Sequence, residues 1–226
     1  PHDPTLANYA DLFAHQRMGR FLFNSLLVAS LATALSLGFN VTAGYAFAKL
    51  HFRGREKLFR FLLAVVVIPG QLTMLPLFFQ LKTLGLLNSY AGVVVPFMTS
   101  LFGIFLVRQY ALGLPNEMLQ AARVDGASEW MIFRKIVLPN LSPIIVTLAV
   151  FTFLAAWNDF LWPLIVLSDD HNYTLPLAIA SLSQEHIQDS GMVMACATVT
   201  IAPVILLFLA LQRHYVRGLL AGSVKG

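Results

Sequence analysis

The sequence predicts an all-α protein that crosses a membrane several times. Of its 226 residues, 58% are hydrophobic and 12% are charged, and the mean hydropathy is +0.72. A soluble protein usually carries about twice that charged fraction. Apolar runs of the length that a helix needs to cross a bilayer, about 20 residues, recur along the chain. The formal charge of +4 lies in the short segments between these runs, which argues against a nucleic-acid-binding protein.

Five membrane spans are expected, at residues 21–48, 62–81, 90–107, 141–167 and 191–211. A short polar arm, 1–20, precedes them. The second span contains Pro69-Gly70 and Pro76, which free backbone groups that neighbouring helices must satisfy, so this span is expected to be kinked and interior. Among the polar side chains of the first span, four predict a face packed against protein rather than lipid. They are Asn24, Ser25, Asn40 and Thr42.

The distribution of basic residues predicts the orientation. Segments 49–60, 108–140 and 212–226 together hold all but three of the 15 Lys and Arg residues. Cytoplasmic loops are enriched in these residues, so the three segments are expected inside and 1–20, 82–89 and 168–190 outside. An odd number of spans with an outward arm predicts that a further span precedes Pro1.

No catalytic group is expected in this chain. The six His residues are scattered without metal-ligand spacing, no phosphate-binding glycine loop occurs, and the single Cys196 lies in an apolar run. Asp159 is the one ionisable residue predicted deep within a span, where charge is costly and often functional. With Asn158 it could line the outer part of a polar pathway, or it could form a structural cap or an inter-helix hydrogen bond.

The cytoplasmic segment at about 115–138 is predicted to be a pair of short helices. The first, 115–124, begins at Pro115 and has Met118, Leu119 and Ala122 on one side, with Ala121 beside them. Asp125-Gly126 breaks it, because glycine readily adopts the left-handed conformation that ends a helix. Ser128 can cap the second helix, 129–137, before Pro139 stops it. Its apolar stripe is Trp130, Phe133, Ile136 and Val137.

Two readings of this segment follow from its residues. The small Ala121, Ala122 and Gly126 would let the surface of another protein approach closely. Alternatively, the segment could lie on the membrane surface as an amphipathic loop.

The spacing from Gln120 to Pro139, Q-A-A-x3-G-x9-I-x-L-P, resembles the EAA loop of ABC-importer permease subunits, in particular the carbohydrate-uptake branch to which the second permease of maltose transporters belongs. Gln120 departs from the usual Glu of that motif. The stretches 24–29, 157–167 and 212–226 also resemble this family, so the likeness covers essentially the whole chain.

The resemblance implies a type I ABC-importer transmembrane domain, 21–226, in a bacterial or archaeal cytoplasmic membrane. It implies contact with an ATPase subunit dimer through Glu117, Gln120, Ala121, Ala122, Asp125, Gly126, Ala127 and Ser128. The other implied partners are a homologous second permease, an extracytoplasmic solute-binding protein at loop 168–190, and membrane lipid. ATP and Mg²⁺ would be bound by the ATPase, not by this chain.

The implied activity is uptake of an oligosaccharide or another sugar by alternating access. Within the same class the solute could be a glycerol 3-phosphate, a glycerophosphodiester or a polyol. Two other classes remain open on the residues alone: an ion-coupled secondary transporter, which would need more intramembrane ionisable groups than Asp159, and a structural membrane protein without transport.

Overall fold

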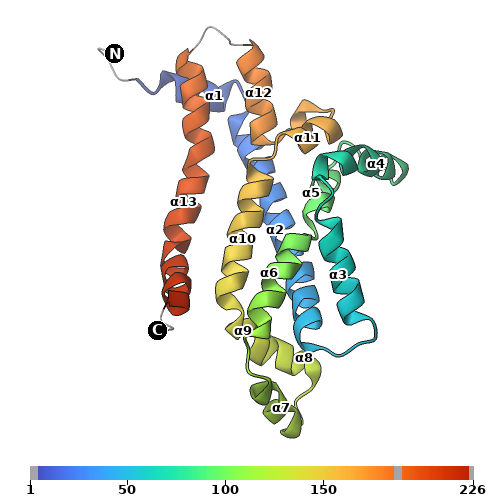
Figure 1. Ribbon diagram of the computed structural model, residues 1–226. Coiled ribbons are helices and arrows are strands. Elements are labelled where there is room, and N and C mark those ends of the chain that lie inside the picture. Colours follow the sequence, from blue (N-terminus) through green and yellow to red (C-terminus); the bar gives the residue numbers. More distant parts are fainter. Residues whose placement is uncertain (1–4, 186–189, 224–226) are drawn as a thin grey trace. The chain divides into compact units, whose positions relative to one another are not determined.

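The computed structural model describes residues 5–185 and 190–223, and every regular element in these ranges is a helix (Figure 1). In chain order the helices are α1 (Ala7–Ala14), α2 (Met18–Lys49), α3 (Arg55–Val65), α4 (Gly70–Thr83), α5 (Tyr90–Val94), η1 (Val95–Phe97), α6 (Leu101–Leu112), α7 (Asn116–Val124), α8 (Glu129–Ile132), η2 (Phe133–Val137), α9 (Leu138–Asn140), α10 (Ser142–Trp157), α11 (Leu161–Val166), η3 (Asp170–Asn172), α12 (Leu175–Glu185) and α13 (Ser190–Ser223).

The helices provide up to five membrane spans, as the sequence predicts. α2 and the segment Gly191–Leu209 of α13 are each long and apolar enough on their own. Three further spans arise if α3 with α4, α5–η1 with α6, and α8–α9 with α10 are each counted as one broken span. The predicted fourth span is therefore wrong at its outer end, because α10 finishes at Trp157 and a separate helix, α11, follows.

The second span is interrupted between Val65 and Gly70, close to the expected kink. Within this chain alone, the residues at the interruption are not covered. Val66, Val67 and Ile68 are 52%, 82% and 51% exposed. Pro76 stays inside α4. An apolar surface of this kind requires a lipid or protein cover that the chain itself does not supply.

The chain separates into two compact units. Unit 1 contains the described residues of Pro1–Ala32, Gln71–Pro96 and Thr152–Ala210, and unit 2 those of Thr33–Gly70, Phe97–Phe151 and Leu211–Gly226.

In unit 1, polar side chains of α2 hold the segment that follows α11. Asn24 donates from its amide to the backbone oxygens of His171 and Tyr173, both at 3.0 Å, and accepts a 2.7 Å hydrogen bond from the Tyr90 hydroxyl. The Ser25 hydroxyl accepts from the backbone N–H of Leu175 at 2.7 Å. The N-terminal arm is folded as well, since α1 buries Leu12 completely and residues 18–20 already belong to α2.

In unit 2, α2 and α6 pack closely through buried polar and small residues. The Asn40 side chain donates to Ser36 Oγ at 2.7 Å and accepts from the backbone N–H of Ser100 at 2.9 Å, just before α6 begins. Asn24, Ser25 and Asn40 thus lie on protein-packed faces as predicted. Thr42 does not, because it is exposed and its hydroxyl donates to the backbone oxygen of Gly38 in its own helix.

Candidate functional site

The first helix of the predicted cytoplasmic pair is α7, and both of its ends follow local sequence rules. Pro115 is extended (φ −60°, ψ 130°), so it precedes the helix rather than occupying its first turn. At the other end, Gly126 has a φ of +81°. The N–H groups of Gly126 and Ala127 donate to the carbonyls of Arg123 and Ala122, at 3.0 and 2.9 Å. This is a Schellman closure, in which glycine supplies the left-handed residue.

The second helix starts as predicted and ends later. The Ser128 hydroxyl accepts a 3.3 Å hydrogen bond from the N–H of Met131 and so caps α8. The helix does not stop at Val137. It widens into the π-helical turn η2 and continues through Pro139 to Asn140. A π-turn already replaces the usual i→i−4 bonding, so the missing N–H of Pro139 disrupts little.

A common apolar core joins the two helices to each other and to the rest of unit 2. Its buried members include Leu119 and Ala122 of α7, Ile132 of α8, Phe133 and Val137 of η2, Tyr45 of α2 and Val107 of α6. The side chains of Arg123 and Glu129 form an ion pair at 2.6 Å across the turn. The hydrogen bond to Glu129 raises the pKa of Arg123 above its ordinary value. Figure 1 shows the pair at the end of unit 2 where α2 and α6 finish.

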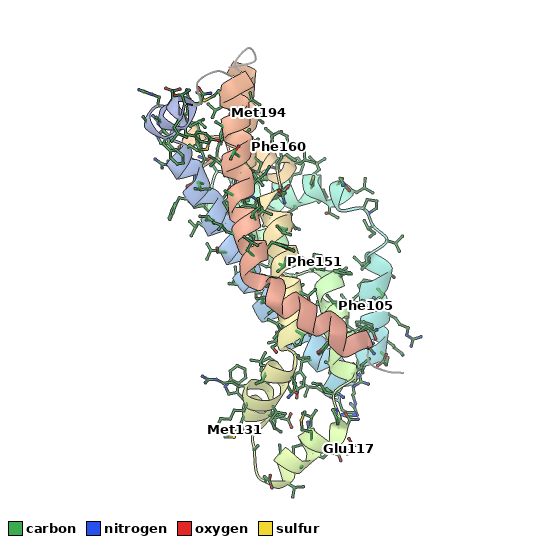
Figure 2. The ribbon with its side chains drawn as sticks, turned by 90° about the vertical axis from the view of Figure 1, so that its left-hand side faces the viewer. Phe105, Glu117, Met131, Phe151, Phe160 and Met194 are labelled. Carbon is green, nitrogen blue, oxygen red and sulfur yellow. The ribbon has the colours of Figure 1, made fainter. Side chains whose placement is uncertain are left out.

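Most of the residues predicted to contact another protein are exposed on this helix pair. Glu117, Gln120, Ala121, Asp125, Gly126 and Ser128 are exposed, and Ala127 is half-buried. Ala122 is different: it packs into the core of its own unit, so it is not available for the close contact expected of it. Ala121 and Gly126 remain the exposed small residues. Figure 2 shows Glu117 and Met131 on the two helices.

Three large apolar side chains of the pair lie at the surface, and one of them, Trp130, was expected on the apolar stripe. Val124, Trp130 and Met131 are 87%, 66% and 45% exposed. Helical spacing places Trp130 on the same stripe as Phe133, and the two rings do lie 5.6 Å apart. Trp130 nevertheless sits in the first turn of α8, beyond the edge of the core. An exposed apolar group of this size next to polar residues is typical of an interaction surface.

Gln120 lines a cavity of about 320 Å³ that is rich in cationic groups. The lining residues are Ala48, Lys49, His51, Arg55, Asn116, Leu119, Gln120 and Arg123. A Glu at position 120 would place a carboxylate among these cations, whereas Gln120 contributes a neutral amide. The departure from the motif therefore changes the charge at the wall of this cavity, while the side chain at position 120 keeps the same length.

The two candidate pathway residues lie in the break between α10 and α11. Asn158 is exposed and donates to the backbone oxygen of Leu154 at 2.8 Å. Asp159 is half-buried, and its carboxylate faces the backbone N–H of Trp162 at 3.5 Å. The expectation that Asp159 sits within a continuous span is wrong, because the helix ends two residues earlier. This contact favours the capping role over pathway lining.

The described part of the predicted outer loop is ordered by Asn88. The Asn88 side chain accepts from the N–H groups of Ser168 and Asp169, at 3.1 and 3.0 Å. Asp169 in turn accepts from the N–H of His171 at 2.9 Å, which lowers the pKa of the Asp169 carboxyl. Residues 186–189 of this loop, like 224–226 of the tail, lie outside the described residues.

Comparison with known proteins gives one family for most of the chain. Residues 40–220, which contain the α7–α8 pair, match the family model described as "Binding-protein-dependent transport system inner membrane component".

Individual relatives agree with this match. The chain is 38% identical, over 100% of its length and 81% of the relative, to the arabinooligosaccharides transport system permease protein AraQ of Halalkalibacterium halodurans. It is 36% identical, over 96% of its length and 80% of the relative, to the lactose transport system permease protein LacG of Rhizobium radiobacter. Among solved structures, a chain of a bacterial ABC transporter involved in the import of the acidic polysaccharide alginate has the same fold, with a TM-score of 0.86 at 22% identity over 95% of this chain and 81% of that chain.

Proposed function

Because this chain belongs to the family of binding-protein-dependent transport system inner membrane components, we propose that it is one of two permease subunits of an ATP-driven sugar importer. The observation that carries this proposal is the family match over residues 40–220, which includes the exposed helix pair α7–α8. Family membership also favours an importer over the ion-coupled secondary transporter and over a purely structural protein.

The helix pair α7–α8 is the proposed contact with the ATPase. Its surface combines small residues, Ala121 and Gly126, with the exposed apolar Val124, Trp130 and Met131. A rigid, well-packed helix pair suits the transfer of movement, because the ion pair between Arg123 and Glu129 and the shared core prevent it from bending independently. ATP and Mg²⁺ are bound by the ATPase dimer in this scheme.

Transport proceeds by alternating access in the proposed mechanism. Closure of the ATPase dimer on ATP moves the helix pair of this chain and that of its homologous partner. The spans of the two permeases then open the pathway to the outer side, where the solute-binding protein releases its sugar. The proposed contact with that protein is loop 168–190, whose first residues are held by Asn88 and Asn24.

The proposed solute is an oligosaccharide. Relatives named for arabinooligosaccharides, lactose and alpha-glucosides are each at least 36% identical to this chain. A relative named for sulfoquinovosyl glycerol, 33% identical, keeps glycerol-containing solutes as the second candidate class.

The decisive experiment is reconstitution. The full chain would be co-expressed with the homologous permease, ATPase and solute-binding protein of its own organism, and the purified complex placed in proteoliposomes. We expect the ATPase to co-purify, its ATP hydrolysis to rise when the binding protein is added, and labelled arabino- or gluco-oligosaccharides to accumulate only with ATP and binding protein present. Failure of an ATPase to co-purify would refute the proposal. Uptake of glycerol phosphates or polyols in place of sugars would refute only the solute class.

A further inference from the structure

Lys49, the last residue of α2, is an unusually buried lysine. It is only 8% exposed, whereas the neighbouring Arg53, Lys57 and Arg60 are exposed. Burying an ammonium group is costly unless its donors are satisfied. Its burial therefore requires specific partners.

The partners of Lys49 all lie between the last residue of α6 and the first residue of α7. The ammonium nitrogen donates to the backbone oxygen of Leu114 at 2.6 Å, to Asn116 Oδ1 at 2.8 Å and to the backbone oxygen of Leu112 at 3.4 Å. A lysine has three donors, so each can be used here. All three acceptors are neutral.

These three acceptors belong to three successive pieces of chain. Leu112 is the last residue of α6, Leu114 lies in the connection, and Asn116 is the first residue of α7. The carbonyls at the end of α6 lack partners within that helix and carry the negative end of its dipole. One ammonium group therefore joins the end of α2 to both the end of α6 and the start of α7.

We infer that Lys49 is a positioning residue that transmits the displacement of α7 to the membrane helices α2 and α6. The inference rests on the proposed function, in which α7 is moved by the ATPase. The shared apolar core holds α7 against the rest of unit 2, but its contacts have no fixed direction. The hydrogen bonds of Lys49 are directional and fix the start of α7 to the ends of both helices.

The test compares variants of Lys49 in the reconstituted complex. Lys49→Met keeps an unbranched apolar stem, as long as that of lysine without its ammonium group, and removes the charge and all three donors. Lys57→Met, on the exposed side of α3, is the matched control. Asn116→Ala is a milder variant that removes one acceptor at an exposed position. For each we would measure complex recovery, ATP hydrolysis stimulated by the binding protein, and the number of sugars taken up per ATP hydrolysed.

The ratio of sugar to ATP is the decisive quantity, because a merely destabilised complex loses uptake and hydrolysis together. We expect Lys49→Met to lower this ratio about fivefold or more, within the range typical of lost coupling between sites, while Lys57→Met keeps it. An unchanged ratio in Lys49→Met would overturn the inference, even if both rates fall. If Lys49→Met does not assemble, Asn116→Ala decides: a lowered ratio supports the inference and a wild-type ratio overturns it. If the unmodified chain recovers no ATPase, the proposed function itself fails.

Discussion

Gly44 of α2 lies in direct contact with Val107 of α6. A β-carbon built on Gly44 would stand 2.6 Å from both Cβ and Cγ1 of Val107 and 3.1 Å from the backbone nitrogen of Arg108. These distances are far below van der Waals contact, so the two helices can cross this closely only because position 44 has no side chain. Small residues at membrane helix crossings allow such approach.

Gly44→Ala should therefore destabilise unit 2, although alanine favours helix formation. Overpacking of this kind typically costs about 1–3 kcal/mol. Gly38→Ala is the control in the same helix, because no neighbour that the structure describes lies within 4 Å of its added β-carbon. That variant should be neutral, or more stable by about 0.5–1 kcal/mol. Thermal unfolding of the purified protein in detergent measures both, and equal midpoints for the two variants would contradict the close crossing.

Tyr45→Phe should be a substitution in the core that does not lower the stability, because of the environment of the Tyr45 hydroxyl. This hydroxyl is buried and has no hydrogen-bond partner in the described part of the chain, while the Tyr45 ring packs 5.2 Å from that of Phe133. Tyr45→Phe keeps the ring and removes the unsatisfied group, so the stability should stay the same or rise. Tyr90→Phe is the contrast, because it removes the 2.7 Å bond to Asn24 and should lower the stability by about 1 kcal/mol. A clear loss of stability in Tyr45→Phe would show that its hydroxyl has a partner.

Asn88 should control the order of the segment after α11. It has a φ of +53° and accepts from the N–H groups of Ser168 and Asp169. Asn88→Gly relieves the backbone strain but removes the acceptor, whereas Asn88→Ala removes the acceptor and keeps the strain. Hydrogen exchange at residues 168–169 should accelerate in both, and thermal stability should fall more for Asn88→Ala. Unchanged exchange in both variants would mean that the asparagine is not what orders this segment.

Local sequence rules predicted the helix pair well at positions where the residue type itself favours one backbone role. Gly126 ends α7 in the left-handed conformation and Ser128 caps α8, both as expected. The total of up to five spans, with each broken pair counted as one, also follows from the lengths of the apolar runs. These features depend on the chain near each residue, so the sequence alone contains them.

The sequence was less informative where tertiary packing decides. Helical spacing correctly placed Ala122 on one side with Met118 and Leu119, but Ala122 was also expected to contact another protein, and its packing within unit 2 leaves it unavailable for that contact. The continuation through Pro139 depends on the π-helical turn before it, which has no clear residue signature. The sequence predicted Lys49 only as one of the basic residues of the cytoplasmic segment 49–60. Its partners lie more than 60 residues away, so nothing within that segment distinguishes it from the other basic residues.

Gly126 offers the sharpest test of the proposed ATPase contact, because the chain contains a matched glycine elsewhere. Gly126 and Gly54 have φ values of +81° and +84°, and a β-carbon at either would meet none of the described residues within 4 Å. A side chain at either position therefore suffers the same backbone strain, about 1–2 kcal/mol, without a clash inside the chain. Gly54 immediately precedes α3 and is not one of the residues proposed to contact the ATPase.

Gly126→Trp should abolish ATPase stimulation and sugar uptake in proteoliposomes while the protein still inserts, because the bulky ring would occupy the surface proposed to face the ATPase. Gly54→Trp, equally strained, should retain most of both activities. Gly126→Asn should fall between wild type and Gly126→Trp, since asparagine tolerates the left-handed region better than other residues with a side chain. Normal uptake by well-expressed Gly126→Trp would remove this turn from the contact. An equal loss in Gly54→Trp would show that strain, not the docking surface, causes the defect.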